Sequence, residues 1–381
     1  MEALHTITVC DSGACTACMA CFDSCQFGAI SVEDTLEKRR AVIDPKKCVE
    51  CGACRRMCPQ LNPVELREPI KWWQGWATDP KERAESSSGG VATAISRAFL
   101  ARGGMVCSCA QTGGSFKFLL TDMMPDIEKA RGSKYVKTNP QGVFKSVRDA
   151  LRAGREVLFV GLPCQVAAMR NYTGKFSERL YTVDLICHGT PSPELLSRFL
   201  GEHNKVLNEE LILDFRKKAQ FQLRYRGAET GMFGRIMDRY TIAFLEGMSY
   251  TDNCYSCRYA QVRRASDVTL GDSWGTELAE EKAGGVSLML VQTEKGKQLL
   301  ELADVTLSPV DERRALESNG QLSAPSKKPA GRVIFFNALA EGKTVDDAVF
   351  KAAPRTCIKR SVKSVIKSHV LDWKARGTMK S

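Results

Sequence analysis

The sequence predicts an α+β fold made of a small cysteine-rich head, a mixed α/β body and a basic C-terminal helix. Three observations support this order. The 16 cysteines are densest near the N-terminus, where one spacing occurs twice, and apolar strand patterns alternate with helical ones from about residue 70 onward. Residues 351–381 contain nine Lys or Arg and one acidic residue, which gives this segment +8 of the net charge of +11.

The composition is that of an ordinary globular protein, with 381 residues of which 43% are hydrophobic and 26% charged. No stretch reaches the roughly 18 apolar residues of a membrane helix, and Met1–Val9 lacks the features of a signal peptide. We therefore expect a cytoplasmic protein whose clustered cysteines bind metal or carry out redox chemistry. Outside residues 351–381 the chain carries only +3, so nucleic acid is not an expected partner.

Two cysteine runs in the head share the spacing C-x2-C-x2-C-x3-C. They are Cys15, Cys18, Cys21 and Cys25, and then Cys48, Cys51, Cys54 and Cys58. In two-cluster ferredoxins the last cysteine of each run serves the other cluster. Residues 1–68 are therefore predicted to form a ferredoxin-type iron–sulfur head with two 4Fe–4S clusters. The ligand sets are Cys15, Cys18, Cys21 and Cys58 for one cluster, and Cys48, Cys51, Cys54 and Cys25 for the other.

Zinc is the alternative for these cysteines. Structural zinc sites use pairs of cysteines rather than repeated triples, so the spacing favours clusters. Gln26 stands where a proline usually follows the fourth cysteine, whereas Pro59 follows the second run. This difference affects the turn after Cys25 but removes no ligand.

A serine–glycine loop follows the first strand expected in the body. It lies between a strand predicted over Ile70–Thr78 and a helix predicted over Val91–Arg102. Free backbone N–H groups at the start of a helix suit a phosphate or a flavin pyrophosphate. An ordinary capped helix is the alternative. The loop residues are Ser87, Ser88, Gly89 and Gly90.

Two later strand patterns are each followed by a cysteine and then by a helix. Residues 156–161 lead to Cys164, and residues 180–186 lead to Cys187 and His188. Strand–helix–strand order predicts a parallel unit, and ligands of such sheets gather beyond the carboxyl ends of the strands. We therefore expect both cysteines to face one crevice.

A C-x2-C pair on a later loop completes a possible third ligand set. Cys254 and Cys257 have the spacing that lets one loop hold two corners of a metal centre. Together with Cys164 and Cys187 they are predicted to hold a third 4Fe–4S cluster. The alternatives are a dithiol redox pair, a zinc site or buried structural cysteines.

Six motifs follow one another between about residues 70 and 300. They are Ser87-Ser88-Gly89-Gly90-Val91, Gly132-Ser133-Lys134-Tyr135, the segments 160–165 and 184–189, Cys254-x2-Cys257, and Ser266-Asp267 leading to Gly271-Asp272-x-Trp274-Gly275. In this order they resemble the coenzyme F-420 hydrogenase/dehydrogenase beta-subunit family, in the form with a fused ferredoxin head. The resemblance implies a flavin-binding N-terminal region over residues 69–155 and a C-terminal region over residues 156–325.

The resemblance also implies FAD as a cofactor. Ser87 to Gly90 and Lys134 would help to bind it, although a solvated turn is equally compatible with Lys134. Gly271 and Gly275 would let a planar ring approach beside Asp272, with Trp274 as a stacking wall or as an ordinary core residue. His188 could donate a proton near the flavin, or it could be structural.

The predicted function is that of an iron–sulfur flavoprotein oxidoreductase. A flavin exchanges hydride while clusters carry single electrons, so the protein would couple a two-electron reaction to one-electron transfer. The expected partners are ferredoxin or another redox protein and a small hydride donor or acceptor, either the deazaflavin coenzyme or another organic substrate. The alternative is a non-catalytic electron-transfer subunit of a larger redox complex.

Residues 326–381 are predicted to form a helical basic tail. Its apolar residues recur at helical spacing among lysines and arginines, a pattern that suits an anionic membrane surface or an acidic partner. A final helix docked on its own domain is the alternative. The apolar residues are Ile358, Val362, Val365, Ile366 and Trp373.

Overall fold

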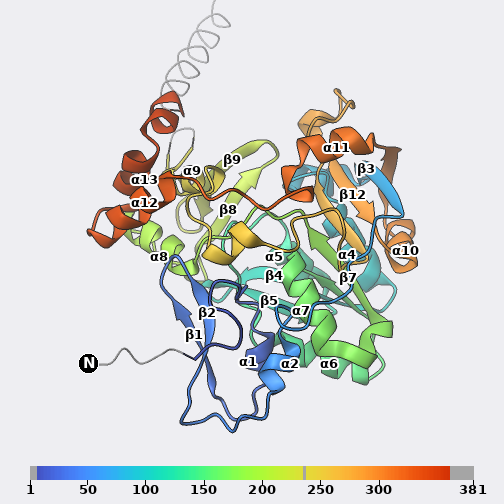
Figure 1. The fold of residues 1–381 in the computed structure, drawn as a ribbon. Coiled ribbons are helices and arrows are strands. Elements are labelled where there is room, and N and C mark those ends of the chain that lie inside the picture. Colours follow the sequence, from blue (N-terminus) through green and yellow to red (C-terminus); the bar gives the residue numbers. More distant parts are fainter. Residues whose placement is uncertain (1–6, 235–236, 361–381) are drawn as a thin grey trace, which may run out of the picture.

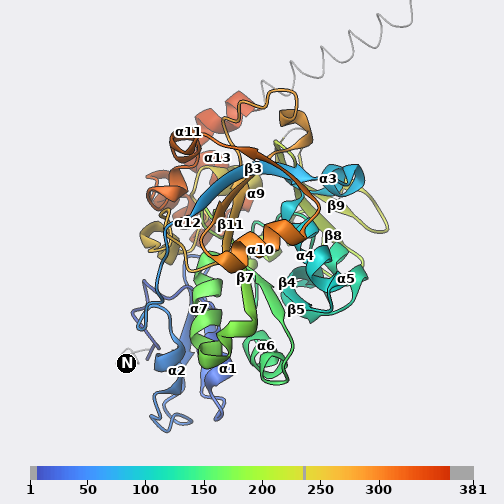
Figure 2. The same cartoon turned by 90° about the vertical axis from the view of Figure 1, so that its right-hand side faces the viewer.

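A large mixed β-sheet forms the centre of the molecule (Figure 1 and Figure 2). The computed structural model describes residues 7–234 and 237–360. The strands follow the order β13-β3-β12-β11-β7-β6-β4-β5. Their bounds are β3 Lys71–Ala77, β4 Met105–Thr112, β5 Ser115–Thr121, β6 Val157–Val160, β7 Leu180–Leu185, β11 Val268–Asp272, β12 Ser287–Val291 and β13 Val305–Pro309.

Most strands of this sheet run in one direction. Strands β4, β6, β7 and β11 pair in parallel. Strand β12 is antiparallel to both β11 and β3, so β3 points the same way as β11. The parallel unit predicted for β6 and β7 is therefore confirmed. The carboxyl ends of β3, β4, β6, β7 and β11 meet at one edge, which is where ligands of such sheets gather.

Helices cover both faces of the sheet. Successive side chains of a strand point in opposite directions, so the apolar residues of the strands form one core on each face. One apolar core lies between the sheet and the helices α4 (Val91–Ala101) and α10 (Glu294–Leu302), and it includes Val106 of β4. The other lies under α6 (Val143–Arg152) and α7 (Pro163–Thr173). Strand, loop and helix alternate here as the sequence predicts.

A second lobe packs a three-stranded antiparallel sheet against helices, around a separate core. Its elements are β8 Ile212–Lys217, β9 Gln220–Arg226, β10 Gly231–Met232, α8 Pro193–Glu202, α9 Arg239–Leu245, α12 Gly331–Ala340 and α13 Val345–Ala352. In Figure 1 the C-terminal helices of this lobe stand above the head. The shorter helices elsewhere in the body are α3 Pro80–Glu85, α5 Met124–Ala130 and α11 Glu312–Ser318.

The predicted basic tail is described only in part. Residues 354–360 are helical after α13, and Ile358 in this turn is 53% exposed. The rest of the predicted basic helix lies outside the described residues. Between residues 7 and 360, apart from 235 and 236, no helix has both the length and the apolar character needed to cross a membrane.

The head shows the internal repeat of its sequence in three dimensions. Each cysteine run contains a short helix, α1 (Ala20–Ser24) in the first and α2 (Ala53–Met57) in the second. The residues before them, Met19 and Gly52, are 33 positions apart and both left-handed, with φ of 64° and 70°. Strands β1 Ile30–Asp34 and β2 Arg39–Ile43 form an antiparallel hairpin between the runs.

The head is docked firmly on the body. Asp23 of α1 accepts hydrogen bonds from the backbone N–H groups of Gly142 (2.6 Å) and Phe144 (3.0 Å), and so caps the start of α6 across the boundary. Cys18 and Ala20 belong to the same apolar cluster as Phe144. Head and body therefore share part of their core.

Candidate redox site

The first predicted ligand set, in which Cys58 of the second run joins three cysteines of the first run, surrounds one cavity in the head. Its lining includes Cys15, Cys18, Cys21 and Cys58. Cys10 also lines the cavity without belonging to either spacing. The backbone N–H of Ala41 lies 3.5 Å from Cys15 Sγ, and hydrogen bonds of this kind tune iron–sulfur centres. The structure thus brings together the cysteines that the crossed assignment pairs.

The second ligand set lies nearer the surface of the head. Burial raises the pKa of Cys54, and the nearby thiolates of Cys48 and Cys25 raise it further. The N–H of Ala29 donates to Cys25 Sγ at 3.4 Å. Cys51 is exposed, which places one member of this set where a partner protein could approach it.

The third ligand set converges at the carboxyl edge of the sheet. Cys164 begins α7 after β6, Cys187 follows β7, and Cys254 lies in a 3-10 helix over Asp252–Ser256. All three line one cavity together with Cys257. Parallel neighbouring strands explain why residues so distant in the sequence meet here.

Polar donors surround the sulfurs of this third set. Asn253 Nδ2 and Thr251 Oγ1 each lie 3.7 Å from Cys254 Sγ. Three more polar side chains line the cavity and are almost fully buried, namely Lys137, Tyr259 and Arg264. Tyr259 Oη has no hydrogen-bond partner within the described ranges. Thiols ringed by unused donors fit a cluster with bridging sulfides, which accepts hydrogen bonds.

A single metal ion would need a different arrangement. Among the described residues, no three His, Cys, Asp or Glu side chains are grouped so that they could hold one ion. A cubane differs from a single ion because each thiolate binds its own iron atom. All 16 cysteines are free thiols rather than disulfides.

The three cysteine sets follow one another in space. Cys21 of the first set and Cys54 of the second contact one small apolar cluster. Cys18 of the first set and Cys164 of the third contact another. Thr16 lines both the first head cavity and the third cavity. An electron path could therefore run from the head surface to the edge of the sheet.

The serine–glycine loop contacts the Gly132-Ser133-Lys134-Tyr135 motif. Ser133 N–H donates to Ser87 Oγ at 2.9 Å, although the two motifs are 46 residues apart. Gly89 N–H donates to Ser287 Oγ at 3.1 Å. A Cβ at Gly89 would lie 2.6 Å from the carbonyl oxygen of Gly75. Close packing on β3 therefore requires glycine at this position.

Lys134 contacts backbone carbonyls near it in the sequence. Its Nζ donates to the carbonyls of Ala130, Arg131 (2.9 Å) and Gly132 (3.1 Å), which occupies all three of its N–H groups. Burial lowers the pKa of Lys134 to about 8. Lys134 thus closes the end of α5, and its role in binding the cofactor stays a prediction.

Lys218 contacts the serine–glycine loop. It lies on the turn between β8 and β9, and its Nζ contacts the carbonyls of Arg83 and Ser88, the latter at 2.7 Å. Burial lowers the pKa of Lys218 to about 8, and the nearby Arg83 and Arg216 lower it further. No local motif marks Lys218, because the contact with Ser88 joins residues 130 positions apart.

Asp272 and Trp274 both contact Arg216. The Asp272 carboxylate accepts two hydrogen bonds of 2.6 Å from the Arg216 guanidinium. That guanidinium lies 5.4 Å from the Trp274 ring centre and 4.7 Å from that of Phe221. Trp274 and Phe221 are stacked at 6.3 Å. The indole therefore belongs to a wall of aromatic and cationic groups.

The glycines beside Asp272 are closely packed. A Cβ on Gly271 would lie 2.4 Å from Cδ1 of Ile186, and one on Gly275 would lie 2.5 Å from Oγ of Ser318. The chain's own side chains fill the space beside both glycines. Internal packing therefore requires glycine at both positions, and the approach of a planar ring stays a prediction.

His188 connects the third cavity with the Asp272 region. It lines that cavity and its side chain is exposed. Surrounding protein lowers the pKa of His188, the Asp272 carboxylate opposes this effect, and Arg216 adds to it. The carbonyl of His188 accepts a hydrogen bond from Ser326 Oγ at 2.7 Å. A neutral imidazole at this position can accept a proton.

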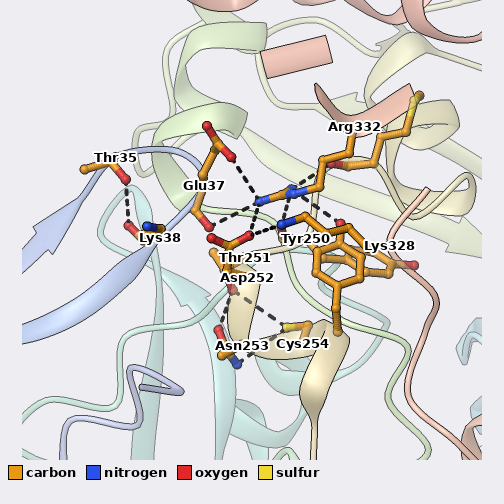
Figure 3. Close-up of polar contacts among 12 residues, drawn as sticks. Thr35, Glu37, Lys38, Tyr250, Thr251, Asp252, Asn253, Cys254, Lys328 and Arg332 are labelled. Atoms are coloured by element: carbon orange, nitrogen blue, oxygen red, sulfur yellow. Dashed lines mark hydrogen bonds and ion pairs between the residues drawn. The ribbon is translucent and has the colours of Figure 1, made fainter. Parts of the chain in front are cut away.

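Figure 3 shows a buried arginine that links three segments. Arg332 of α12 is 1% exposed and donates to the carbonyls of Met248 (2.9 Å) and Tyr250 (2.6 Å). It also donates to Asp252 Oδ1 at 2.9 Å and pairs with Glu37 of the head hairpin at 3.6 Å. Arg332 therefore ties the C-x2-C segment to the head and to the C-terminal helices.

Three family models match successive parts of the chain. Residues 72–143 match the N-terminal and residues 154–311 the C-terminal model of the coenzyme F420 hydrogenase/dehydrogenase beta subunit, and residues 14–61 match a 4Fe-4S dicluster domain. The chain belongs to the coenzyme F420 hydrogenase/dehydrogenase beta-subunit family. Membership confirms the predicted resemblance, and the dicluster match identifies the head as an iron–sulfur domain.

Two relatives are named as components of redox enzymes. A subunit of the F(420)H(2) dehydrogenase of Methanosarcina mazei is 24% identical over 304 residues, which cover 74% of this chain and 83% of the relative. A subunit of an ion-translocating oxidoreductase complex of Methanosarcina acetivorans is 46% identical over 59 residues, which cover 16% of this chain and 20% of the relative.

One solved structure is also similar to this chain. A chain of the F420-reducing NiFe hydrogenase complex of Methanosarcina barkeri aligns with a TM-score of 0.47 and 19% identity, covering 69% of this chain and 97% of that chain. The family match, together with the dicluster head, makes this protein an iron–sulfur oxidoreductase or electron-transfer subunit.

Proposed function

We propose that this protein couples a two-electron hydride reaction at FAD to one-electron transfer through three 4Fe–4S clusters. The serial order of the three cysteine sets carries the proposal, because it leads from the exposed Cys51 to the carboxyl edge of the sheet. When bound, FAD would supply the step between a hydride and single electrons. Cys51 marks the face where a ferredoxin or another redox protein would dock.

The start of α4 supports a place for the FAD phosphates. The N–H groups of Gly90, Val91 and Ala92 have no hydrogen-bond acceptor in the described part of the chain. A helix start attracts negative charge through such groups and through the helix dipole. Lys218 adds a cation beside Ser88. These residues would hold the pyrophosphate.

Arg216, Asp272 and Trp274 would shape the neighbouring wall of the cofactor site. Because the Arg216–Asp272 pair is bidentate and stacked on aromatic rings, it holds both side chains in fixed positions. His188 would accept or return a proton at a ring nitrogen between this wall and the third cavity. Its lowered pKa keeps the imidazole neutral at pH 7.

The hydride partner is proposed from the relatives. The first relative is named as part of an F(420)H(2) dehydrogenase, so the reduced deazaflavin coenzyme is the first donor to test. Another organic hydride donor or acceptor is the alternative within the same mechanism.

The test uses the full chain prepared without air. We expect about twelve irons per chain, as three four-iron clusters require, and one FAD. Reduced deazaflavin coenzyme, NAD(P)H and reduced ferredoxin would be supplied in parallel, and bleaching of the flavin and cluster absorbance recorded. Iron-loaded protein that contains no flavin and responds to none of the hydride donors would overturn the proposal.

A non-catalytic electron-transfer subunit is the second candidate. The match to a component of an ion-translocating oxidoreductase complex is confined to 16% of this chain and supports electron transfer only. Such a protein would exchange electrons with reduced ferredoxin while lacking flavin and dye-linked turnover. Flavin content and turnover with an artificial dye therefore separate the two functions.

A further inference from the structure

The third cavity contains buried positive charge that the first head cavity lacks. Arg264 and Lys137 line the third cavity, and they are 1% and 5% exposed. The described residues that line the first head cavity include no Lys, Arg, Asp or Glu. The two predicted cluster sites therefore differ in electrostatic surroundings although Thr16 lines both of them.

Arg264 has unused hydrogen-bond donors. Its Nε and Nη2 have no partner among the described residues. Its backbone is fixed to Arg67 by two hydrogen bonds, of 3.0 and 2.8 Å. A buried guanidinium without an acceptor is costly unless an anion accompanies it. An anionic group in the cavity would meet this requirement.

The buried carboxylate of Asp184, on which the charge of Arg264 acts, makes no ion pair with that guanidinium among the described residues. Asp184 of β7 is fully buried, and neither of its oxygens has a partner within the described ranges. Burial raises the pKa of Asp184, while the charge of Arg264 opposes this shift.

Lys137 lies between the first and third cysteine sets. Its Nζ contacts the carbonyl of Thr16 and Oδ1 of Asn253, both at 3.3 Å. Asn253 in turn contacts the sulfur of Cys254. The charge of Lys137 is thus held beside the segment that carries the C-x2-C pair.

We propose that Arg264 and Lys137 are positioning residues that raise the reduction potential of the third cluster. Because the charge of Lys137 acts on Cys15 of the first set as well as on Cys164 of the third, it is Arg264 that places the third potential above that of the first head cluster. This inference rests on the third cluster of the proposed function. Reduction adds one electron and no proton, so a reduced cluster is more negative and is stabilised more by nearby cations. Net charge and hydrogen bonds to sulfur are established determinants of cluster potential.

The consequence is a direction of electron flow. One electron leaves the reduced head cluster, which is oxidised, and enters the third cluster, which is reduced, without making or breaking a bond. The step is downhill from head to body. Electrons that enter from either end of the chain would therefore collect on the third cluster before the first head cluster.

The experiment is a redox titration of the full chain, loaded with clusters and followed by electron paramagnetic resonance. Arg264→Gln is decisive because Arg264 lines only the third cavity of the two. We expect the equilibrium constant for reducing the third cluster to fall at least tenfold, or about 59 mV for one electron, with the head potentials unchanged. Arg264→Lys, which keeps the charge, should restore most of the shift.

Arg263→Gln is the matched control, because this neighbouring side chain is 55% exposed and pairs with Glu68 at 3.8 Å. It should leave all potentials unchanged. If wild-type protein holds only about eight irons, the proposed third cluster is absent. If Arg264→Gln keeps about twelve irons and the wild-type potential, only the present inference is overturned.

If Arg264→Gln loses about four irons, its third cluster is missing and the third potential is measured in Lys137→Met instead. A fall in the third potential of that variant supports the proposal. An unchanged third potential in Lys137→Met overturns it. A wild-type titration in which the third cluster is reduced at a lower potential than the first head cluster would also overturn it.

Discussion

Replacing Arg332 by methionine should loosen the segment that carries the C-x2-C pair. The buried guanidinium donates to the carbonyls of Met248 and Tyr250 and to Asp252. Methionine keeps apolar contact with Phe336, whose ring centre lies 4.4 Å from the guanidinium carbon. The substitution therefore removes hydrogen bonds and charge while leaving most of the packing volume.

The magnitude follows from the groups left without partners. Met248 and Tyr250 are 2% and 3% exposed, and a buried acceptor left unsatisfied costs about 1–3 kcal/mol. Asp252 retains Lys328 at 3.3 Å, so its carboxylate adds little. The free energy of local opening should fall by about 3 kcal/mol, which corresponds to a roughly hundredfold rise in opening.

Hydrogen exchange of backbone amides measures this change. The Asp252 N–H donates to the carbonyl of Glu37 at 2.9 Å, and the Cys254 N–H donates to that of Thr251 at 2.9 Å. Both amides should exchange about a hundredfold faster in Arg332→Met, whereas the Gly161 amide within the large sheet should not change.

Arg313→Met is the control for a lost surface arginine, since the Arg313 side chain is 88% exposed. It should leave exchange in residues 251–254 at the wild-type rate. The same wild-type rate in Arg332→Met would refute the assigned role of Arg332.

Three further variants test other parts of the structure. Cys254→Ala combined with Cys257→Ala should lower the iron content by about four per chain, while the paramagnetic resonance signals of the head clusters persist. An unchanged iron content in this double variant would show that these cysteines hold no third cluster. Lys218→Met should lower flavin occupancy. In the wild type, flavin affinity should be highest below pH 8 and should decrease above it, because Lys218 loses its proton at its pKa of about 8. A wild-type affinity that does not change with pH would contradict the role of Lys218. Asp23→Ala should speed exchange at the start of α6 roughly tenfold, because a lost helix cap costs about 0.5–2 kcal/mol; unchanged exchange there would show that Asp23 does not stabilise the docked head.

The sequence predicts those features that depend on short-range patterns. The repeated cysteine spacing identifies the dicluster head, which the family match confirms. Strand–helix alternation predicts the parallel unit of β6 and β7. From that unit alone, Cys164 and Cys187 are expected at one edge of the sheet, because parallel neighbours end together. The region boundaries at residues 68, 155 and 325 stay predictions.

The features that the sequence could not predict depend on long-range packing. Lys218 meets Ser88 only because the β8–β9 hairpin folds over the start of α4. Lys134 belongs to a family motif, yet three nearby carbonyls occupy its N–H groups. Gly271 resembles a ligand-binding glycine, but Ile186 fills the space beside it. Segments distant in sequence decide the contacts of Lys218 and Gly271, whereas backbone carbonyls two to four residues away decide those of Lys134.

The docking of the head affects how the clusters can work together. A loosely tethered ferredoxin domain would deliver electrons only in those orientations that bring its cluster near the body. Here Asp23 caps α6, Lys137 holds Thr16, and Arg332 holds Glu37. These contacts lie around the boundary between the first and third cysteine sets, so the spacing between those sets is fixed by the fold. Transfer between them would then depend on cluster potentials rather than on domain motion, and the proposed effect of Arg264 on the third potential would act at this step.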